Sequence, residues 1–293
     1  MSFDYARDPV IILGVPRSGT TLITELLQRA GLFIGHSILA DKEAKYFFSV
    51  NSQILRSIHA YWDNPSPVRF LVRDSDRVAR IVEDLEAELR SFRIANYLGW
   101  KSYVKFRSLA QFDTPWGWKD PQNVLTLPIW LRVFPKAKVV YIVRNGVAVA
   151  NSLVAVQSGV ISKRLERNQG RVTRLGARFK ERIGVKGSSR CLTLEGSFSL
   201  WEEYVTQAEE VLQSVNNERR VVKYEEFLSE PADHLRSLAR FCGLEPPASE
   251  TLYDHLEIVD ATKAASFLQT PALVRFHSEV RMSRWMAHYG YGG

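Results

Sequence analysis

Cysteine is scarce in this chain of 293 residues, which contains only Cys191 and Cys242. Two cysteines without C-x-x-C spacing supply neither a disulfide framework nor a zinc motif. The apolar runs are too short to span a bilayer, and the first residues, MSFDYARDP, are polar and charged. We therefore expect no signal peptide and no membrane span. With so few cysteines and no signal peptide, we expect a cytoplasmic protein. The sequence also lacks a cluster with metal-ligand spacing, so we expect no metal site.

The run GVPRSGTT, residues 14–21, lies between an apolar strand-like segment at 10–13 and a helix-like segment at 20–30. Gly14 and Gly19 have the G-x-x-x-x-G spacing of a phosphate-binding loop, whose backbone N–H groups surround an anion at a helix N-terminus. A loop that binds ATP or GTP places a lysine where this chain has Thr20. Arg17 supplies a cation within the loop instead. This pattern favours a phosphate-like ligand without a triphosphate–magnesium unit.

A second strand-loop-helix segment, VVYIVRNGVAVANSL, covers residues 139–153. Arg144 follows the strand-like run, and Ser152 lies eight residues later in the following helix-like run. A guanidinium and a hydroxyl in these places are able to meet one phosphate. The alternative is an ordinary arginine at a strand end and a serine on a helix surface.

The alternation of strand-like and helix-like segments continues to the end of the chain, with helices expected at 44–60, 76–96 and 199–214 and a strand at 220–224. Neither repeats nor low-complexity tracts interrupt it. This alternation predicts an α/β fold with a mainly parallel central sheet flanked by helices. With its glycine loop, this fold resembles that of the P-loop nucleotide kinases. We expect a single domain over 1–293, with both phosphate loops at carboxyl ends of strands.

Together these segments resemble the PAPS-dependent sulfotransferases, and the motif style is most similar to bacterial glycan-type and tyrosylprotein members. The family's loop for the 5′-phosphosulfate has the pattern P-[KR]-x-G-T-T, and a later arginine and serine hold its 3′-phosphate. The resemblance implies that the chain binds PAPS through residues of both loops and moves its sulfuryl group to a hydroxyl, releasing PAP. The implied PAPS-binding residues are Arg17, Ser18, Gly19, Thr20, Thr21, Arg144, Ser152 and Tyr224.

Three further segments agree with this family. In GWKDP, residues 117–121, Lys119 matches a catalytic lysine, whose ammonium would stabilise the charge that develops on the leaving phosphate. In VVKYEEF, Tyr224 matches the tyrosine that lies against adenine, and the ending RMSRWMAHYGYGG is similar to the family's terminal helix. Many relatives have aspartate where this chain has Ala148. Arg17 and Lys119 are therefore predicted to act in catalysis, although Lys119 next to Asp120 also fits a surface ion pair.

A general base must accept the proton of the attacking hydroxyl, and a carboxylate or an imidazole suits this role. Tyrosylprotein sulfotransferases place a glutamate after the first helix. The corresponding stretch here, GLFIGHSILADKEAKYFF, contains His36, Asp41 and Glu43. We expect Glu43 to be the base and keep His36 and Asp41 as alternatives.

Net charge is concentrated in residues 161–190, where ten Lys or Arg stand against two Glu, a local net of +8 within a total of +7. This segment is interpreted as a basic, lid-like element that meets PAPS, an anionic acceptor or an anionic membrane surface. A solvated basic helix or a disordered loop is the alternative. The aromatic residues clustered between Tyr97 and Trp118 more often belong to a core. If one aromatic side chain lines an acceptor pocket, Trp62 and Trp116 are the candidates, because turn-forming residues surround both.

The sequence therefore predicts a sulfotransferase whose partners are PAPS and a hydroxyl acceptor, with a saccharide or small metabolite favoured by the KDP motif and with no nucleic acid. The oligomeric state stays open. Two other functions are kept as alternatives. One is a non-catalytic module that binds PAP or another anion, and the other is an atypical P-loop kinase.

Overall fold

The computed structural model describes residues 5–169 and 187–293. The chain divides into two compact units. Unit 1 comprises Met1–Arg144 and Tyr204–Ala265, and unit 2 comprises Asn145–Glu203 and Ser266–Gly293. The single domain over 1–293 stays a prediction.

Unit 1 is built on a four-stranded sheet with the order β2-β1-β3-β4, in which all neighbouring strands are parallel. The strands are β1 (Val10–Gly14), β2 (Gly117–Lys119), β3 (Lys138–Val143) and β4 (Arg219–Lys223). The central strands β1 and β3 are apolar and almost wholly buried, as expected for parallel strands covered on both faces. The predicted mainly parallel sheet flanked by helices is thereby confirmed. The short strand β2 was not predicted.

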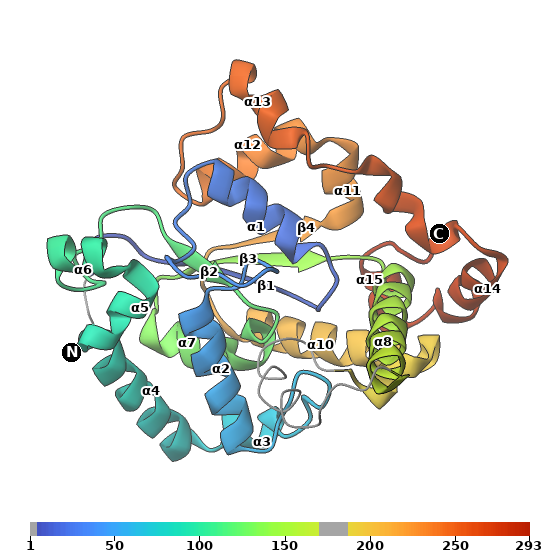
Figure 1. The fold of residues 1–293 in the computed structure, drawn as a ribbon, viewed down its shortest axis with the longest axis horizontal. Helices are drawn as coiled ribbons and strands as arrows, with labels where there is room; N and C mark the ends of the chain where they lie inside the picture. The colour runs from blue at the N-terminus through green and yellow to red at the C-terminus, as the bar shows by residue number, and fades with distance from the viewer. Residues whose placement is uncertain (1–4, 170–186) are drawn as a thin grey trace. The chain divides into compact units, whose positions relative to one another are not determined.

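Helices of unit 1 cover the sheet (Figure 1). One group lies on one face: α1 (Thr20–Arg29), α11 (Tyr224–Ser229), α12 (Pro231–Phe241) and α13 (Ser249–Leu256). The other group is α2 (Lys45–Ser57), α3 (Val68–Arg73), α4 (Ser75–Arg90), η1 (Phe92–Ile94), α5 (Ala95–Leu98), α6 (Trp100–Phe106) and α7 (Asn123–Val133). Tyr224, predicted within a strand, is instead the first residue of α11.

The face under α1 has an aliphatic core. Ile23, Leu26 and Leu27 of α1 follow helical spacing and are fully buried, in one cluster with Ile142 of β3 and Leu235 of α12. Each such side chain contributes about 1.5–3 kcal/mol when it is removed from water. This packing fixes α1, and with it the loop that precedes α1, to the end of β1.

The other face has an aromatic core around β2. The rings of Phe47 and Trp118 stack at 4.0 Å with an interplanar angle of 8°, and Trp116 and Trp130 pack beside them. Trp116 is fully buried and donates from Nε1 to the carbonyl of Arg7. Trp116 therefore belongs to the core, and the prediction that it lines an acceptor pocket is wrong. Trp62 is partly exposed, and its carbonyl accepts a hydrogen bond from Tyr204.

Unit 2 is helical in its described residues. Its elements are α8 (Gly146–Gln169), η2 (Ser189–Leu192), the first half of α10 (Leu194–Ser214), the end of η3 (Ala261–Leu268), α14 (Pro271–Val280) and α15 (Arg284–His288). α8 begins tightly against α10, because a Cβ on Gly146 would lie 2.7 Å from the Phe198 ring. Most of the basic segment 161–190 lies outside the described residues, at 170–186.

Within the described residues, no helix combines the length and the apolar character that a bilayer crossing requires. Both cysteines are buried and free of disulfides.

Candidate active site

The carboxyl ends of all four strands meet at one edge of the sheet, where open α/β sheets bind ligands. β1 leads into the glycine loop, β2 ends at Lys119, Arg144 follows β3, and Tyr224 follows β4. The topology therefore brings together predicted site residues that are more than 200 positions apart in the sequence.

The glycine loop turns sharply because two positions have left-handed backbone. Gly19, the N-cap of α1, has a φ of 94°, and Arg17 has a φ of 74°. Gly14 leaves no room for a side chain, since a Cβ there would lie 2.6 Å from the carbonyl oxygen of Ile142. The loop thus exposes backbone N–H groups at the start of α1, where the helix dipole favours an anion.

Ser18 and Arg17 differ in their surroundings within this loop. The Ser18 side chain is fully buried, and its Oγ has no hydrogen-bond partner among the described residues. Because a Cβ on Gly14 would lie 2.7 Å from Ser18 Oγ, this hydroxyl points to the inside of the loop. A buried hydroxyl without a partner costs about 1–3 kcal/mol, which a ligand oxygen would recover. Arg17 is exposed and flanks the same loop.

Arg144 and Tyr224 close the loop from the side. The guanidinium of Arg144 lies 4.7 Å from the centroid of the Tyr224 ring, and Nη1 donates to the carbonyl of Arg17 at 3.2 Å. A Cβ on Gly19 would lie 2.2 Å from the Tyr224 ring, so this ring rests directly on the loop. Glu225 is also 4.0 Å from Nε of Arg144. Arg144 is thereby held at the glycine loop with its charge almost buried.

Ser152 is on α8 in unit 2, whereas Arg144 is in unit 1. The shared grip of these two residues on one phosphate stays a prediction.

Lys119 and Glu43 form a buried ion pair. Lys119 Nζ lies 3.1 Å from Glu43 Oε1, and 2% of the Lys119 side chain is exposed. Lys119 therefore does not form the alternative surface ion pair. Burial raises the pKa of Glu43 although the charge of Lys119 lowers it. A carboxylate with a raised pKa beside an ammonium is suited to proton transfer.

Glu43 is placed by a short hairpin. Residues Ile38 and Ala44 pair as an antiparallel bridge, Leu39 N–H donates to the carbonyl of Glu43, and Lys42 at the tip has a φ of 63°. The carbonyl of Asp41 accepts from Lys119 Nζ at 2.9 Å and from Thr21 Oγ1 at 3.2 Å. One backbone oxygen thus connects the start of α1 to Lys119.

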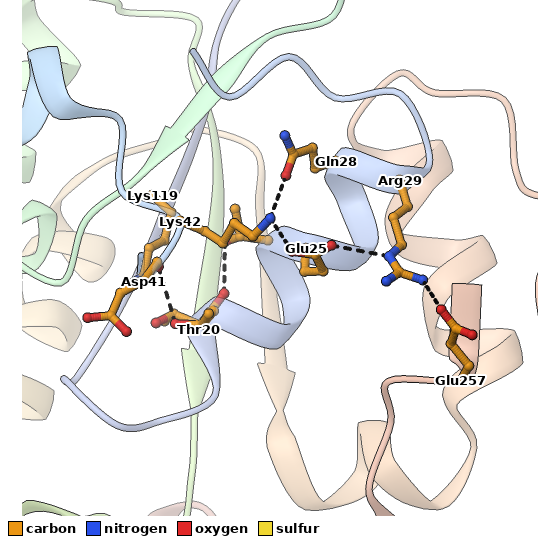
Figure 2. Close-up of polar contacts among 10 residues, drawn as sticks. Thr20, Glu25, Gln28, Arg29, Asp41, Lys42, Lys119 and Glu257 are labelled. Carbon is orange, nitrogen blue, oxygen red and sulfur yellow. Dashed lines mark hydrogen bonds and ion pairs between the residues drawn. The ribbon is translucent and has the colours of Figure 1, made fainter. Parts of the chain in front are cut away.

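A chain of ion pairs holds the hairpin tip on α1 (Figure 2). Lys42 is paired with Glu25 and donates to Gln28 Oε1 at 3.2 Å. Glu25 also accepts from Arg29 at 3.2 Å, and Arg29 reaches Glu257 at 2.9 Å. The pKa of Glu25 is lowered, chiefly by its hydrogen bond with Lys42. This anchor was not predicted from the sequence, where its only local signal is that Glu25 and Arg29 are one helical turn apart.

The three candidates for the general base are not equivalent in the structure. The exposed His36 packs its ring against Gly99, where a Cβ would lie 2.8 Å from the imidazole. Asp41 is also exposed and uses its carbonyl rather than its carboxylate in the contacts described above. Glu43 alone among the three is buried and paired with Lys119.

A polar network behind Lys119 was also missed from the sequence. Asp120 is fully buried in the turn between β2 and α7, and Asn51 Nδ2 of α2 donates to its Oδ2 at 2.8 Å. Asn123 Oδ1 accepts from Trp118 Nε1 at 2.9 Å, while its Nδ2 donates to the carbonyl of Ile12. The available signal was an asparagine among apolar residues at Asn51 in α2 and at Asn123, which begins α7, because buried amides need partners. No group of three or more acidic, histidine or cysteine side chains suited to a metal ion occurs in the described part of the chain.

Comparison with known proteins gives one family and a set of similar structures. The family model described as "Sulfotransferase family" matches residues 9–248. The sulfotransferase domain of the Synechococcus PCC 7002 olefin synthase is 17% identical, with a TM-score of 0.47 and coverage of 91% of this chain and 89% of that one. Sulfotransferase STF1 from Mycobacterium tuberculosis H37Rv is 14% identical, with a TM-score of 0.46 and coverage of 87% and 72%. No curated protein matches the chain.

Proposed function

The chain belongs to the sulfotransferase family, and we propose that it transfers a sulfuryl group from PAPS to a hydroxyl acceptor and releases PAP. The observation that carries this proposal is the carbonyl of Asp41, which accepts from Thr21 of the glycine loop and from Lys119. This shared contact supports the proposal that the glycine loop and the buried Lys119–Glu43 pair act in one site.

The proposed roles follow from the chemistry of each group. Ser18 and the N–H groups of residues 19–21 bind the 5′-phosphosulfate with Arg17 at the side, and Arg144 with Ser152 binds the 3′-phosphate. Tyr224 lies close enough to the loop to support an adenine ring.

Transfer forms a bond between the acceptor oxygen and sulfur while the bond from sulfur to the phosphate oxygen breaks. Glu43 accepts the hydroxyl proton, and the leaving phosphate keeps the electron pair. Lys119 offsets the negative charge that develops on that phosphate. Glu43 and Lys119 are suited to these two tasks because their charged ends are already adjacent in a buried place.

The acceptor proposed is a saccharide or small hydroxyl metabolite, on the strength of the KDP motif at 119–121. A metal-independent reaction in the cytoplasm is part of the same proposal. Both cysteines are buried and form no disulfide, which is compatible with a reducing compartment.

Two measurements test this function together. Calorimetric titration with PAP tests nucleotide binding, and turnover of PAPS with a panel of hydroxyl acceptors tests sulfuryl transfer. Lys119→Met should lower kcat by about 10²–10³-fold, since one stabilising donor is lost, while PAP affinity stays within about threefold. Lys45→Met removes an exposed lysine near the same hairpin and serves as the matched control.

Three results would contradict the proposal in different ways. PAP binding without turnover on any acceptor would leave the non-catalytic anion-binding module. Phosphate transfer from magnesium-ATP without PAP binding would indicate a kinase. Equal turnover in Lys119→Met and wild type would remove Lys119 from the mechanism.

A further inference from the structure

Helix α6 presents an apolar surface that the core of unit 1 does not cover. None of its residues is buried, whereas every other α-helix of unit 1 buries at least one side chain. Figure 1 shows α6 on the outside of unit 1, beside α5. Trp100 is 64% exposed, and Val104, one helical turn further on the same face, is 57% exposed. A large exposed indole next to an exposed aliphatic side chain indicates a surface that meets a partner.

The Trp100 ring has a defined support in α6. The Tyr103 ring meets it edge-on, with centroids 5.7 Å apart and an interplanar angle of 88°. At the end of the helix, Phe106 packs against the buried Phe112 with ring centroids 5.1 Å apart. This contact ties α6 to the core, so the helix holds Trp100 in an exposed position.

Cations accompany the exposed indole, without acidic neighbours in the sequence. Lys101, Lys105 and Arg107 are exposed, and none of the three forms an ion pair with a described residue. No acidic residue occurs between Glu88 and Asp113. The surface therefore combines apolar side chains with unpaired positive charge. Its partner must offer an apolar interior and negative charge at the same boundary.

We propose that α6 docks on the surface of an anionic lipid bilayer. Tryptophan is favoured at the boundary between lipid headgroups and acyl chains, where its ring is buried and its N–H stays hydrated. Trp100 and Val104 enter this boundary, and the three cations of the surface contact the negative headgroups. The contact is peripheral and shallow, because the helix has only seven residues.

Two other occupants fit this surface less well. In a symmetric contact between two copies of the chain, the same cations of both copies would face each other without acidic partners, and like charges repel. A single-stranded nucleic acid would pair with the cations and stack a base on Trp100. It would leave the aliphatic Val104 without a matching apolar surface. A bilayer satisfies both the charge and the apolar side chains.

Helix α3 offers an internal control for exposed aromatic area. Phe70 is 61% exposed, nearly as much as Trp100, and the guanidinium of Arg69 lies 4.8 Å from its ring centroid. Asp74 and Asp76 follow α3 directly, so the cations of this helix have acidic neighbours. The proposal therefore assigns bilayer docking to α6 and not to α3.

Sedimentation of the full chain with lipid vesicles tests the apolar part of the surface. Wild type should bind vesicles of phosphatidylcholine with phosphatidylserine and not vesicles of phosphatidylcholine alone. Trp100→Ser should weaken this binding by about tenfold or more, because most of the indole leaves water on docking. Phe70→Ser is the matched control and should leave binding unchanged. Unchanged binding in Trp100→Ser, or an equal loss in Phe70→Ser, overturns the proposal.

The same assay tests the charges. Lys105→Gln combined with Arg107→Gln should weaken binding by about 25-fold, since each cation near an anionic bilayer contributes about fivefold. Arg56→Gln combined with Arg240→Gln removes the same net charge from exposed positions on α2 and α12, and should weaken binding much less. Equal losses in the two double variants would mean that the net charge of +7 alone attracts the vesicles, which overturns the proposal.

Quenching of tryptophan fluorescence by brominated lipids measures insertion of the indole directly. Trp100 is the most exposed tryptophan of the chain, so vesicles that contain these lipids should quench wild type and leave Trp100→Ser unquenched. Vesicle binding without quenching overturns the proposal.

Two further outcomes would assign the surface to another partner and overturn the proposal as well. One is binding of a single-stranded oligonucleotide that Trp100→Ser abolishes, in a chain that does not bind vesicles. The other is self-association that Trp100→Ser abolishes, measured by sedimentation equilibrium. None of these measurements uses PAPS or an acceptor, so their results do not depend on the proposed function.

Discussion

Two regions meet at the same edge of the sheet but are built from different chemical groups. One is the glycine loop at 14–21, and the other is the hairpin at 38–44 together with the end of β2. The loop offers backbone N–H groups and the Ser18 hydroxyl, and its shape depends on two glycines and a left-handed Arg17. The hairpin and β2 offer two buried charges, Glu43 and Lys119, which pair with each other, and Lys119 also donates to the carbonyl of Asp41. The backbone of one loop can therefore form most of an anion site. A proton-transfer site needs tertiary contacts that surround and pair its buried charges.

We expect the largest effect from a substitution that removes the backbone freedom of a glycine in the loop. Gly19→Ala should lower the free energy of unfolding by about 2–4 kcal/mol, because alanine disfavours a φ of 94° and its Cβ would lie 2.2 Å from the Tyr224 ring. PAP binding should disappear within the calorimetric range. Urea unfolding and calorimetry measure the two effects.

Gly243→Ala separates the cost of backbone strain from the cost of a steric clash with a neighbouring side chain. Gly243 has a φ of 73°, but a Cβ there meets no atom within 4 Å. Only the backbone cost of about 1–2 kcal/mol is expected, with PAP affinity unchanged. Equal losses in both variants would mean that the contact with Tyr224 contributes nothing.

The same contrast explains which parts the sequence could predict. Strand β1, the loop and Arg144 follow from hydrophobic runs and spacings shorter than ten residues, so local rules place them. β2 has three residues and no recognisable period, and its register depends on pairing with Ile11 and Ile12 more than a hundred positions away. The burial of Trp116 depends on the same pairing.

The interior of the site follows from long-range packing as well. The hydrogen bonds of Asn51 join residues about 70 to 80 positions apart. Lys42 forms an ion pair with Glu25 of α1, and no sequence motif predicts the turn that brings them together. Glu43 was preferred to His36 and Asp41 on family resemblance, and only the structure gives it the buried place beside Lys119. Its role as the base stays a prediction.

A smaller change at the loop side tests the geometry of the cation rather than its charge. Arg144→Lys keeps a positive charge but loses the planar fork that spans the carbonyls of Arg17 and Lys263. The dissociation constant for PAP should rise by about 10- to 100-fold, the loss of one charge-assisted hydrogen bond. Arg220→Lys is the control, since Arg220 also lies over an aromatic ring, that of Phe241. Unchanged PAP affinity in Arg144→Lys would remove Arg144 from the phosphate site.

On the hairpin side, Lys42→Met should affect turnover more than binding. The ion pair with Glu25 is partly exposed, so its loss costs at most about 1 kcal/mol and loosens the tip that positions Glu43. We expect kcat to fall by about fivefold with PAP affinity unchanged, measured by initial rates and calorimetry. Lys101→Met, an exposed lysine on α6, is the control. A raised dissociation constant with normal kcat would indicate that the tip serves the loop instead.

The smallest expected effect is the pH dependence of Glu25. Its pKa is lowered from 4.5, chiefly by the hydrogen bond with Lys42, so the ionised form stabilises the fold above that pH. This stability is lost as the pH falls through the lowered value. Wild type should exceed Glu25→Gln by less than about 1 kcal/mol at pH 7 and by nothing near pH 2, in urea unfolding at low salt. In a Lys42→Met background the difference at pH 7 should shrink, because the main cause of the lowered pKa is gone. A difference that instead grows toward acid would require Glu25 to bind its proton more tightly in the folded chain, opposite to its ion pairs with Lys42 and Arg29.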